Sequence, residues 1–334
     1  MKRIFITGGA GYVGAKLTYE LLKDGYEVTV FDWMLFEPNL FSDITNNKNF
    51  NLIKGDLRDR KLLEKAIKNN DAVIHLACLS NDPSCEIDAS LTKSINLDAS
   101  IDLIKIAKEN NIKLFINASS ASVYGIKEEE NVTEECKLEP ITLYAKYKVE
   151  VERFLNSQID NNFAGVSIRP ATLCGYSLRQ RLDLTVNILT YQAIVNGKIT
   201  VFGGEQKRPN LSISDMVDIY KLLLKTPIKK INGQVFNAGF ENYKVIEIAE
   251  IVRETLMQPV DIEVTPSNDH RSYHINSSKI TKELNYTPKH NIRDAIKELK
   301  DAITRGDLHD VSDDRYRNVN YLLKRKNELE LERV

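Results

Sequence analysis

Short apolar runs alternate with longer helix-forming stretches along the first half of the chain. The runs typical of strands cover residues 2–7, 27–31, 50–54, 72–77, 113–118 and 164–169. The stretches between them that favour helix are 15–23, 59–69, 91–110 and 144–158. Strands that alternate with helices in this way build a parallel sheet with helices on both faces. We therefore predict an α/β fold with a doubly wound parallel sheet.

Glycines mark the turn that follows the first strand. Gly8, Gly11 and Gly14 fall at three-residue spacing between that strand and the first helix, with Tyr12 and Val13 among them. Glycine lets such a turn close tightly, and it lets backbone N–H groups approach a pyrophosphate that then lies at the helix N-terminus. The turn therefore predicts a dinucleotide site. A purely structural turn is the plainer interpretation, because glycines occur in many loops.

The residue that ends the second strand narrows the choice of ligand. Asp32 lies eighteen residues beyond Gly14, close to the spacing expected of a carboxylate that accepts hydrogen bonds from both ribose hydroxyls. A 2′-phosphate would face the same carboxylate, so we predict NAD rather than NADP as the cofactor. A phosphate loop of the GxxxxGK[ST] type fails, because Ala15 stands where its lysine would be.

Composition and charge mainly exclude other classes of protein. The 334 residues carry a net charge of −1, which provides no basic field for nucleic acid or for anionic lipid. No apolar run approaches the length of a membrane span and the first strand begins at residue 2, so we expect a cytoplasmic protein. The four cysteines form no CxxC pair and the histidines no convincing ligand pattern, so no metal site is predicted.

Two polar residues at the carboxyl ends of strands and one pair on a helix are candidates for chemistry or binding. Asp56 follows the third strand, where its carboxylate suits either an adenine amino group or the cap of the next helix. Ser120 follows the fifth strand, where hydroxyls suit a substrate oxygen, although serine-rich turns are common without function. Tyr144 and Lys148 open the next helix four residues apart, so we expect the ammonium group to lower the pKa of the phenol.

Taken together, these segments resemble the extended short-chain dehydrogenase/reductases, the NAD-dependent sugar-nucleotide epimerases and dehydratases typified by UDP-galactose 4-epimerase. The segments that carry the resemblance are TGGAGYVG at 7–14, Asp32, GDLRD at 55–59, HLA at 75–77, SSASVYG at 119–125 and YAKYK at 144–148. They follow the family's order from residue 2 to about residue 300. The combination is specific, whereas each segment alone is not.

The resemblance implies a Rossmann NAD-binding domain at 1–168, a smaller and mainly substrate-binding α/β domain at 169–305, and a helical tail at 306–334. The tail extends past the family's usual end. Its segment 318–333 is charged and helix-prone, and we expect it to dock on the body, dock on a partner subunit or fray. The family commonly dimerises through a four-helix bundle that includes the YxxxK helix, so a homodimer is expected.

The resemblance also implies roles for individual residues. Ser120 matches the family's catalytic Ser/Thr, Tyr144 its base and Lys148 the lysine that binds the nicotinamide ribose. The implied cofactor contacts are Gly8, Gly11, Tyr12, Val13, Gly14, Asp32, Asp56, Leu57, Leu76, Ala77, Asn96, Tyr144 and Lys148. The implied contacts of a nucleoside-diphosphate sugar are Ser120, Ser122, Arg179, Arg181, Asn187, Arg208 and Arg271.

Two segments depart from the family pattern. Pro209-Asn210 and Ser212 replace the usual acidic, aromatic and histidine positions around Arg208. The loop GYSLRQRLD at 175–183 resembles a GxSPRxRxD run of a subgroup near the GDP-heptose 4-dehydrogenases of capsule synthesis, with a leucine in place of the proline. We expect its two arginines to lie near the substrate diphosphate, or else to form a solvated basic loop.

The predicted function is NAD-dependent chemistry at C4 of a nucleotide-activated sugar, for surface polysaccharide synthesis. The family's 4,6-dehydratases carry an Asp-Glu pair after the catalytic residue, where this chain has Ala121 and Ser122. The glutamate of the decarboxylases and the cysteine of the 3,5-epimerase/reductases are absent as well. Epimerisation or net oxidation at C4 therefore remains, and the family's epimerase type case favours a 4-epimerase. The alternatives are a GDP-heptose-like 4-dehydrogenase that releases a 4-keto sugar, and a non-catalytic NAD- and nucleotide-binding protein.

Overall fold

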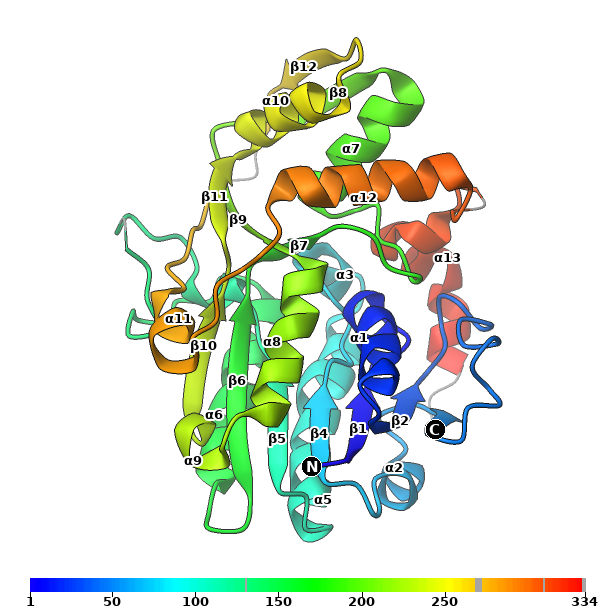
Figure 1. Ribbon diagram of the computed structural model, residues 1–334, viewed down its shortest axis with the longest axis vertical. Coiled ribbons are helices and arrows are strands. Elements are labelled where there is room, and N and C mark those ends of the chain that lie inside the picture. The colour runs from blue at the N-terminus through cyan, green and yellow to red at the C-terminus, as the bar shows by residue number, and fades with distance from the viewer. Residues whose placement is uncertain (130, 268–271, 309, 332–334) are drawn as a thin grey trace.

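The central sheet of the described chain has seven parallel strands in the order β10-β6-β5-β4-β1-β2-β3 (Figure 1). The computed structural model describes residues 1–129, 131–267, 272–308 and 310–331. The strands are β1 (Arg3–Thr7), β2 (Glu27–Asp32), β3 (Phe50–Lys54), β4 (Ala72–His75), β5 (Leu114–Ala118), β6 (Ala164–Pro170) and β10 (Gln234–Ala238). Both faces of β4 and β6 are buried, which is why these strands read as continuous apolar runs. The predicted doubly wound Rossmann sheet is confirmed.

Helices cover both faces of this sheet. α1 (Tyr12–Lys23) and α8 (Ile213–Lys225) lie side by side on one face, where they pack on Ile4 and Ile6 (Figure 1). The opposite face packs around Phe5 and is covered by α2 (Arg60–Ala66), α5 (Ala99–Glu109) and α6 (Leu143–Gln158). The helical stretch before β5 is longer than α5 alone, because α4 (Ala89–Lys93) runs into it through the π-helical turn η1 (Ser94–Asp98).

The predicted domain boundary at residue 168 needs correction. The strand β10 pairs in parallel with β6, and its Phe236 is fully buried in the core of the first domain. The helix α8 also belongs to this domain, since its apolar face packs beside α1. The chain therefore leaves the Rossmann domain after β6 and returns to it at α8. The burial of the edge of β6 explains the return, which no local sequence pattern indicates.

A smaller α/β unit lies at the carboxyl ends of the large sheet, in the upper part of Figure 1. Its three-stranded sheet has the order β11-β9-β7, and a second sheet pairs β12 with β8. Its elements are β7 (Thr172–Cys174), α7 (Thr185–Asn196), β8 (Lys198–Phe202), β9 (Lys207–Ser212), β11 (Glu241–Lys244), α10 (Val245–Leu256), β12 (Asp261–Thr265) and α12 (Ile292–Arg305). The remaining short elements are α3 (Asp82–Glu86), η2 (Ala121–Tyr124), α9 (Ile228–Ile231), α11 (Ser278–Leu284) and η3 (Asp314–Tyr316). No helix among the described residues is long and apolar enough to cross a membrane.

The C-terminal helix α13 (Asn318–Leu331) docks on the body of the same chain, beside the loop that follows β2 (Figure 1). Leu322 is only 3% exposed and packs with Leu79 and Ile95. The Tyr321 hydroxyl donates a 2.8 Å hydrogen bond to the carbonyl of Leu35. Of the three expected fates of the tail, the structure shows docking on the body.

We predict that Leu322→Ala lowers the free energy of unfolding by about 2 to 4 kcal/mol, because it leaves a cavity under α13. Leu323→Ala is the matched control on the same helix, since Leu323 is 55% exposed. We expect this control to change stability by no more than about 0.5 kcal/mol. Chemical denaturation of both variants measures the difference. Equal losses would show that α13 does not hold this position in solution.

Candidate active site

A cavity of about 340 Å³ lies at the carboxyl ends of the parallel strands. The strand order reverses between β1 and β4, and ligands of open α/β sheets bind at such a reversal. The predicted site residues that line the cavity are Gly8, Gly11, Tyr12, Val13, Gly14, Asp32, Asp56, Leu57, Leu76, Ala77, Ser120, Ser122, Tyr144, Lys148, Arg179 and Arg181. The fold therefore brings most of the residues named from sequence to one place.

The glycines of the first turn are required by close backbone contacts. A Cβ on Gly8, whose φ is +73°, would lie 2.5 Å from the backbone nitrogen of Ala77. A Cβ on Gly14 would lie 2.3 Å from the carbonyl oxygen of Gly8. The helix α1 begins at Tyr12, directly after Gly11, and no side chain caps it. Its first N–H groups have no partner within the helix, so the turn fits a pyrophosphate.

Asp32 lies at the end of β2 with its carboxylate in the cavity wall. One oxygen accepts the N–H of Ala10 at 2.9 Å and the other accepts the N–H of Met34 at 2.7 Å. Burial raises the pKa of this carboxyl group, while the two backbone hydrogen bonds oppose that rise. Each oxygen of a carboxylate has a further lone pair, so Asp32 retains acceptors for ribose hydroxyls.

The structure decides between the two interpretations of Asp56. The N-cap of α2 is Asp59, whose side chain accepts the N–H of Leu62, so the capping interpretation of Asp56 is wrong. Asp56 instead forms an ion pair with Arg58, whose guanidinium lies 5.4 Å from the centre of the Trp33 ring. Asp56 and Trp33 both line the cavity, which is consistent with an adenine site between them.

Asn96 occupies a supporting position in the π-helical turn before α5. Its amide oxygen accepts the N–H of Leu79 at 2.8 Å, and its amide nitrogen donates to the carbonyl of Leu79 at 3.0 Å. Neighbouring Leu79 and Ser80 line the cavity, whereas Asn96 does not. The structure therefore shows Asn96 fixing the loop after β4, while a direct cofactor contact stays a prediction.

Ser120, Tyr144 and Lys148 line the cavity together, as predicted. The Ser120 hydroxyl accepts a 2.9 Å hydrogen bond from the Ser122 hydroxyl. The ammonium nitrogen of Lys148 donates to the carbonyl of Ala118 at 2.7 Å and lies 5.6 Å from the centre of the Tyr144 ring. The end of β5 and the first turn of α6 thus place hydroxyl, phenol and ammonium in one pocket.

The expected low pKa of the Tyr144 phenol is corrected by the structure. Burial raises the pKa of Tyr144 well above its ordinary value, and the nearby Cys78, Cys85 and Asp82 raise it further. Hydrogen bonding with Ser120 lowers the pKa but does not outweigh burial. Positive charge next to the phenol, such as that of an oxidised nicotinamide, would favour its ionised form.

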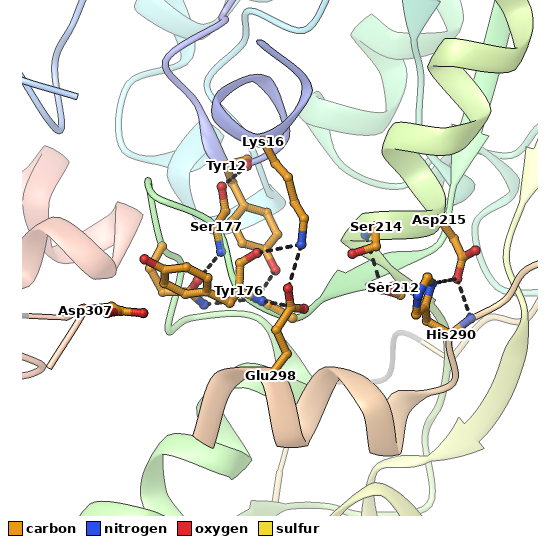
Figure 2. A network of polar contacts seen from close by, with 12 residues as sticks. Tyr12, Lys16, Tyr176, Ser177, Ser212, Ser214, Asp215, His290, Glu298 and Asp307 are labelled. Atoms are coloured by element: carbon orange, nitrogen blue, oxygen red, sulfur yellow. Dashed lines mark hydrogen bonds and ion pairs between the residues drawn. The ribbon is translucent and has the colours of Figure 1, made fainter. Parts of the chain in front are cut away.

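The loop at 175–183 is tied to α1 and α12 rather than solvated (Figure 2). The Tyr12 hydroxyl donates to the carbonyl of Gly175 at 2.6 Å, and the Ser177 hydroxyl donates to the carbonyl of Tyr12 at 2.7 Å. Arg179 and Arg181 are only 4% and 7% exposed, so the interpretation as a solvated basic loop is wrong.

The other residues predicted to contact the substrate lie outside the cavity wall or outside the described chain. Asn187, on α7, accepts the N–H of Gly175 and donates to the Tyr12 hydroxyl, so its amide holds the loop. Arg208, on β9, lies 5.3 Å from the centre of the ring of Tyr273, which does line the cavity. Arg271 lies outside the described residues.

Sequence reasoning missed residues that reach the cavity from distant segments. Asn318, at the start of α13, lines the cavity and accepts a 2.6 Å hydrogen bond from Arg179. Asp82 lines it beside Tyr144 and accepts a 2.5 Å hydrogen bond from the Thr142 hydroxyl. The HLA motif at 75–77 marks the end of β4 but does not extend to Asp82. A charged tail gave no signal for Asn318.

The chain matches the model of the NAD dependent epimerase/dehydratase family over residues 4–239. It belongs to that family. A relative, the UDP-glucose 4-epimerase of Lactobacillus helveticus, is 28% identical over 318 residues, which cover 88% of this chain and 94% of that protein. UDP-glucuronic acid decarboxylase 1 of Arabidopsis thaliana is also 28% identical, over 88% of this chain and 68% of that protein.

The same relationship holds for solved structures. The UDP-glucuronic acid 4-epimerase of Bacillus cereus, in complex with UDP-glucuronic acid and NAD, superposes with a TM-score of 0.82 at 25% identity. The match covers 91% of this chain and 99% of that one. The chain is therefore an enzyme of the NAD-dependent sugar-nucleotide epimerase and dehydratase class, and its cofactor is NAD. The glycine turn and Asp32 fit that cofactor.

We predict that the protein binds NAD at least about tenfold more tightly than NADP, because the Asp32 carboxylate repels a 2′-phosphate. Calorimetric titration with each dinucleotide measures the ratio. Asp32→Asn removes the charge with little change of volume, so the preference should narrow in that variant. Equal affinities for the two dinucleotides in the unaltered protein would contradict the role of Asp32.

We predict that Tyr144→Phe loses roughly 10²-fold or more in turnover and keeps nearly unaltered NAD binding, because the lost hydroxyl carries the proton. Tyr147→Phe is the matched control, since Tyr147 is a half-buried residue of the same helix and does not line the cavity. The measurements are kcat with an accepted nucleotide sugar and the NAD affinity. Full turnover in Tyr144→Phe would place the base elsewhere.

Proposed function

We propose that this enzyme is a 4-epimerase of a nucleoside-diphosphate sugar. The observation that carries the proposal is the meeting of Ser120, Tyr144 and Lys148 in the cavity, at a strand end whose next residues are Ala121 and Ser122. The UDP-glucose and UDP-glucuronic acid 4-epimerases among its relatives support this reading. The decarboxylase relative shows that overall identity alone does not select the reaction.

The residues have separate tasks in the proposed reaction. The Tyr144 phenolate accepts the proton of the sugar O4 hydroxyl, and the Ser120 hydroxyl holds the same oxygen by a hydrogen bond. Lys148, fixed by the Ala118 carbonyl, orients the nicotinamide ribose and contributes positive charge beside the phenol. When bound, NAD supplies hydride-transfer chemistry at C4. In an epimerisation, Tyr144 would return the proton to O4 once the configuration at C4 has changed.

Loss of water is disfavoured by the groups at the catalytic end of the cavity. Elimination across C5 and C6 needs an acid and a base, and neither Ala121 nor Ser122 serves as either at neutral pH. Asp82 is a carboxylate at this end of the described cavity wall, and the Thr142 hydroxyl already donates to it. We therefore assign Asp82 to the support of α3 and α6 rather than to elimination.

The main alternative is a net 4-oxidation that releases the 4-keto sugar. The likeness of the 175–183 loop to the subgroup near GDP-heptose 4-dehydrogenases favours this second function. A non-catalytic nucleotide-binding protein is the alternative of another class. The family membership and the joint presence of hydroxyl, phenol and ammonium in the cavity weigh against it.

The setting of the reaction is also a proposal. We propose a cytoplasmic homodimer that supplies an activated sugar for surface polysaccharide. The outer sides of α5 and α6 carry Ile101, Tyr147 and Phe154, which are only partly covered within the described chain. These residues suit the packing of the same two helices from a second copy.

We predict that the true substrate shows exchange of configuration at C4, with no loss of water and no release of CO₂. Incubation with a panel of nucleoside-diphosphate hexoses, hexuronic acids and heptoses tests this, with products resolved by NMR and mass spectrometry. A free 4-keto product formed in step with reduced nicotinamide would establish the dehydrogenase alternative. A 4-keto-6-deoxy product would overturn the assignment, and Asp82 would then be the first acid to replace.

A further inference from the structure

Two buried arginines border the part of the cavity that the dinucleotide motif defines. We propose that Arg179 and Arg181 bind the pyrophosphate of NAD, and that Asn318 of the C-terminal helix holds Arg179 in place. This assignment differs from the substrate diphosphate expected from sequence. It rests on the family's cofactor and not on which sugar the enzyme accepts.

Both arginines line the same cavity as the glycine turn and Asp32. Their loop is fixed to the start of α1, since the Ser177 hydroxyl donates to the Tyr12 carbonyl and the Tyr12 hydroxyl donates to the carbonyl of Gly175 (Figure 2). An electrostatic interaction of Arg179 with Asp32 and with Tyr12 agrees with this arrangement. In a Rossmann site the pyrophosphate lies between the helix N-terminus and the ribose carboxylate.

The surroundings of Arg179 suit the binding of an anion. Its side chain is almost fully buried, its guanidinium lies 3.9 Å from the centre of the Phe36 ring, and its Nη2 atom donates to Asn318 at 2.6 Å. Its Nε atom is buried and has no hydrogen-bond partner. An unpaired donor in the interior is costly unless a ligand satisfies it.

The electrostatics of Arg179 agree with this geometry. Burial and the neighbouring charge of Arg181 together lower the pKa of its guanidinium to about 9, although Asp183 and Asp32 oppose the change. The Asp32 carboxylate also accepts two backbone N–H groups, so its negative charge does not serve Arg179 alone. A pyrophosphate would add the negative charge that the site lacks and would favour the charged form of Arg179.

Arg181 completes the site from the next turn of the loop. Its Nε and Nη2 atoms donate to the two oxygens of Asp183, and its Nη1 atom donates to the Ser80 hydroxyl at 3.2 Å. Asp183 neutralises one of the two positive charges. Among the described residues Arg179 has no such bidentate carboxylate partner, so its guanidinium is the group of the pair that suits a phosphate near the N-terminus of α1.

Asn318 is a positioning residue that joins three segments. Its amide oxygen accepts from Arg179, its amide nitrogen donates to the Ser80 hydroxyl at 2.9 Å, and its backbone N–H donates to Asp183 at 2.9 Å. The helix that follows it packs on the loop after β2. The C-terminal helix thus holds the arginine pair against the dinucleotide end of the cavity.

The decisive variant is Arg179→Met, which keeps much of the side-chain length and removes the charge. We expect the NAD dissociation constant to rise roughly tenfold to a hundredfold, because a charge-assisted hydrogen bond to phosphate is lost. We expect the melting temperature of the NAD-free variant to stay equal or rise, because a buried unpaired charge is removed. Calorimetric titration with NAD and thermal unfolding of NAD-depleted protein measure the two effects without any sugar substrate.

Arg293→Met is the matched control, since Arg293 forms an exposed ion pair with Glu254 on the far side of α12. We expect its NAD affinity to equal that of the unaltered protein. Asn318→Ala should weaken NAD binding less than Arg179→Met does, because it loosens the guanidinium without removing it.

Two outcomes would overturn the proposal. Unaltered NAD affinity in Arg179→Met, with a raised KM for the nucleotide sugar, would return the arginines to the substrate diphosphate. Unaltered NAD affinity with lowered stability would make Arg179 a structural residue. Failure of the 4-epimerase assignment leaves all these binding results unchanged, so the two proposals fail independently.

Discussion

The close approach of the first turn to the end of β4 is the constraint on which the site depends. The backbone of Gly8 lies so near Ala77 that a single added methyl group would collide with it. This contact brings the N-terminus of α1 and the loop after β4 to the same point of the sheet edge. The segment after β4 contacts the N-terminus of α6 through the hydrogen bond between Asp82 and Thr142. It contacts the C-terminal helix through the hydrogen bond between Ser80 and Asn318. A larger residue at position 8 would separate all of these groups.

Two polar anchors join α12 and the segment before it to the Rossmann domain, and Figure 2 shows a contact of each. On α1, Lys16 forms a 2.7 Å ion pair with Glu298 of α12. On α8, the buried carboxylate of Asp215 accepts the backbone N–H groups of Lys289 and His290. Charged groups held by several partners are costly to move, so α12 has a fixed position above the sheet.

The residues that follow Ser120 say more about the type of reaction than sequence identity to relatives does. Relatives with equal identity to this chain are named for different reactions. Hydroxyl, phenol and ammonium groups suit oxidation and reduction at one carbon, while the absence of an acid–base pair after Ser120 argues against elimination. Burial raises the pKa of the Tyr144 phenol, so positive charge beside the phenol would favour its ionisation.

The sequence by itself determined six of the seven strands of the sheet, the glycine turn and the proposed catalytic positions. These features are local, because glycine spacing, strand periodicity and a four-residue helical spacing depend on a few neighbouring residues. Only the tertiary structure decided the return of β10 to the large sheet, the capping of α2 by Asp59 and the docking of α13. It also decided that the arginines of the 175–183 loop lie buried beside Asn318, which is 139 residues from Arg179. Such contacts depend on which apolar faces and charges remain uncovered once the sheet has formed, and no short stretch of sequence contains that information.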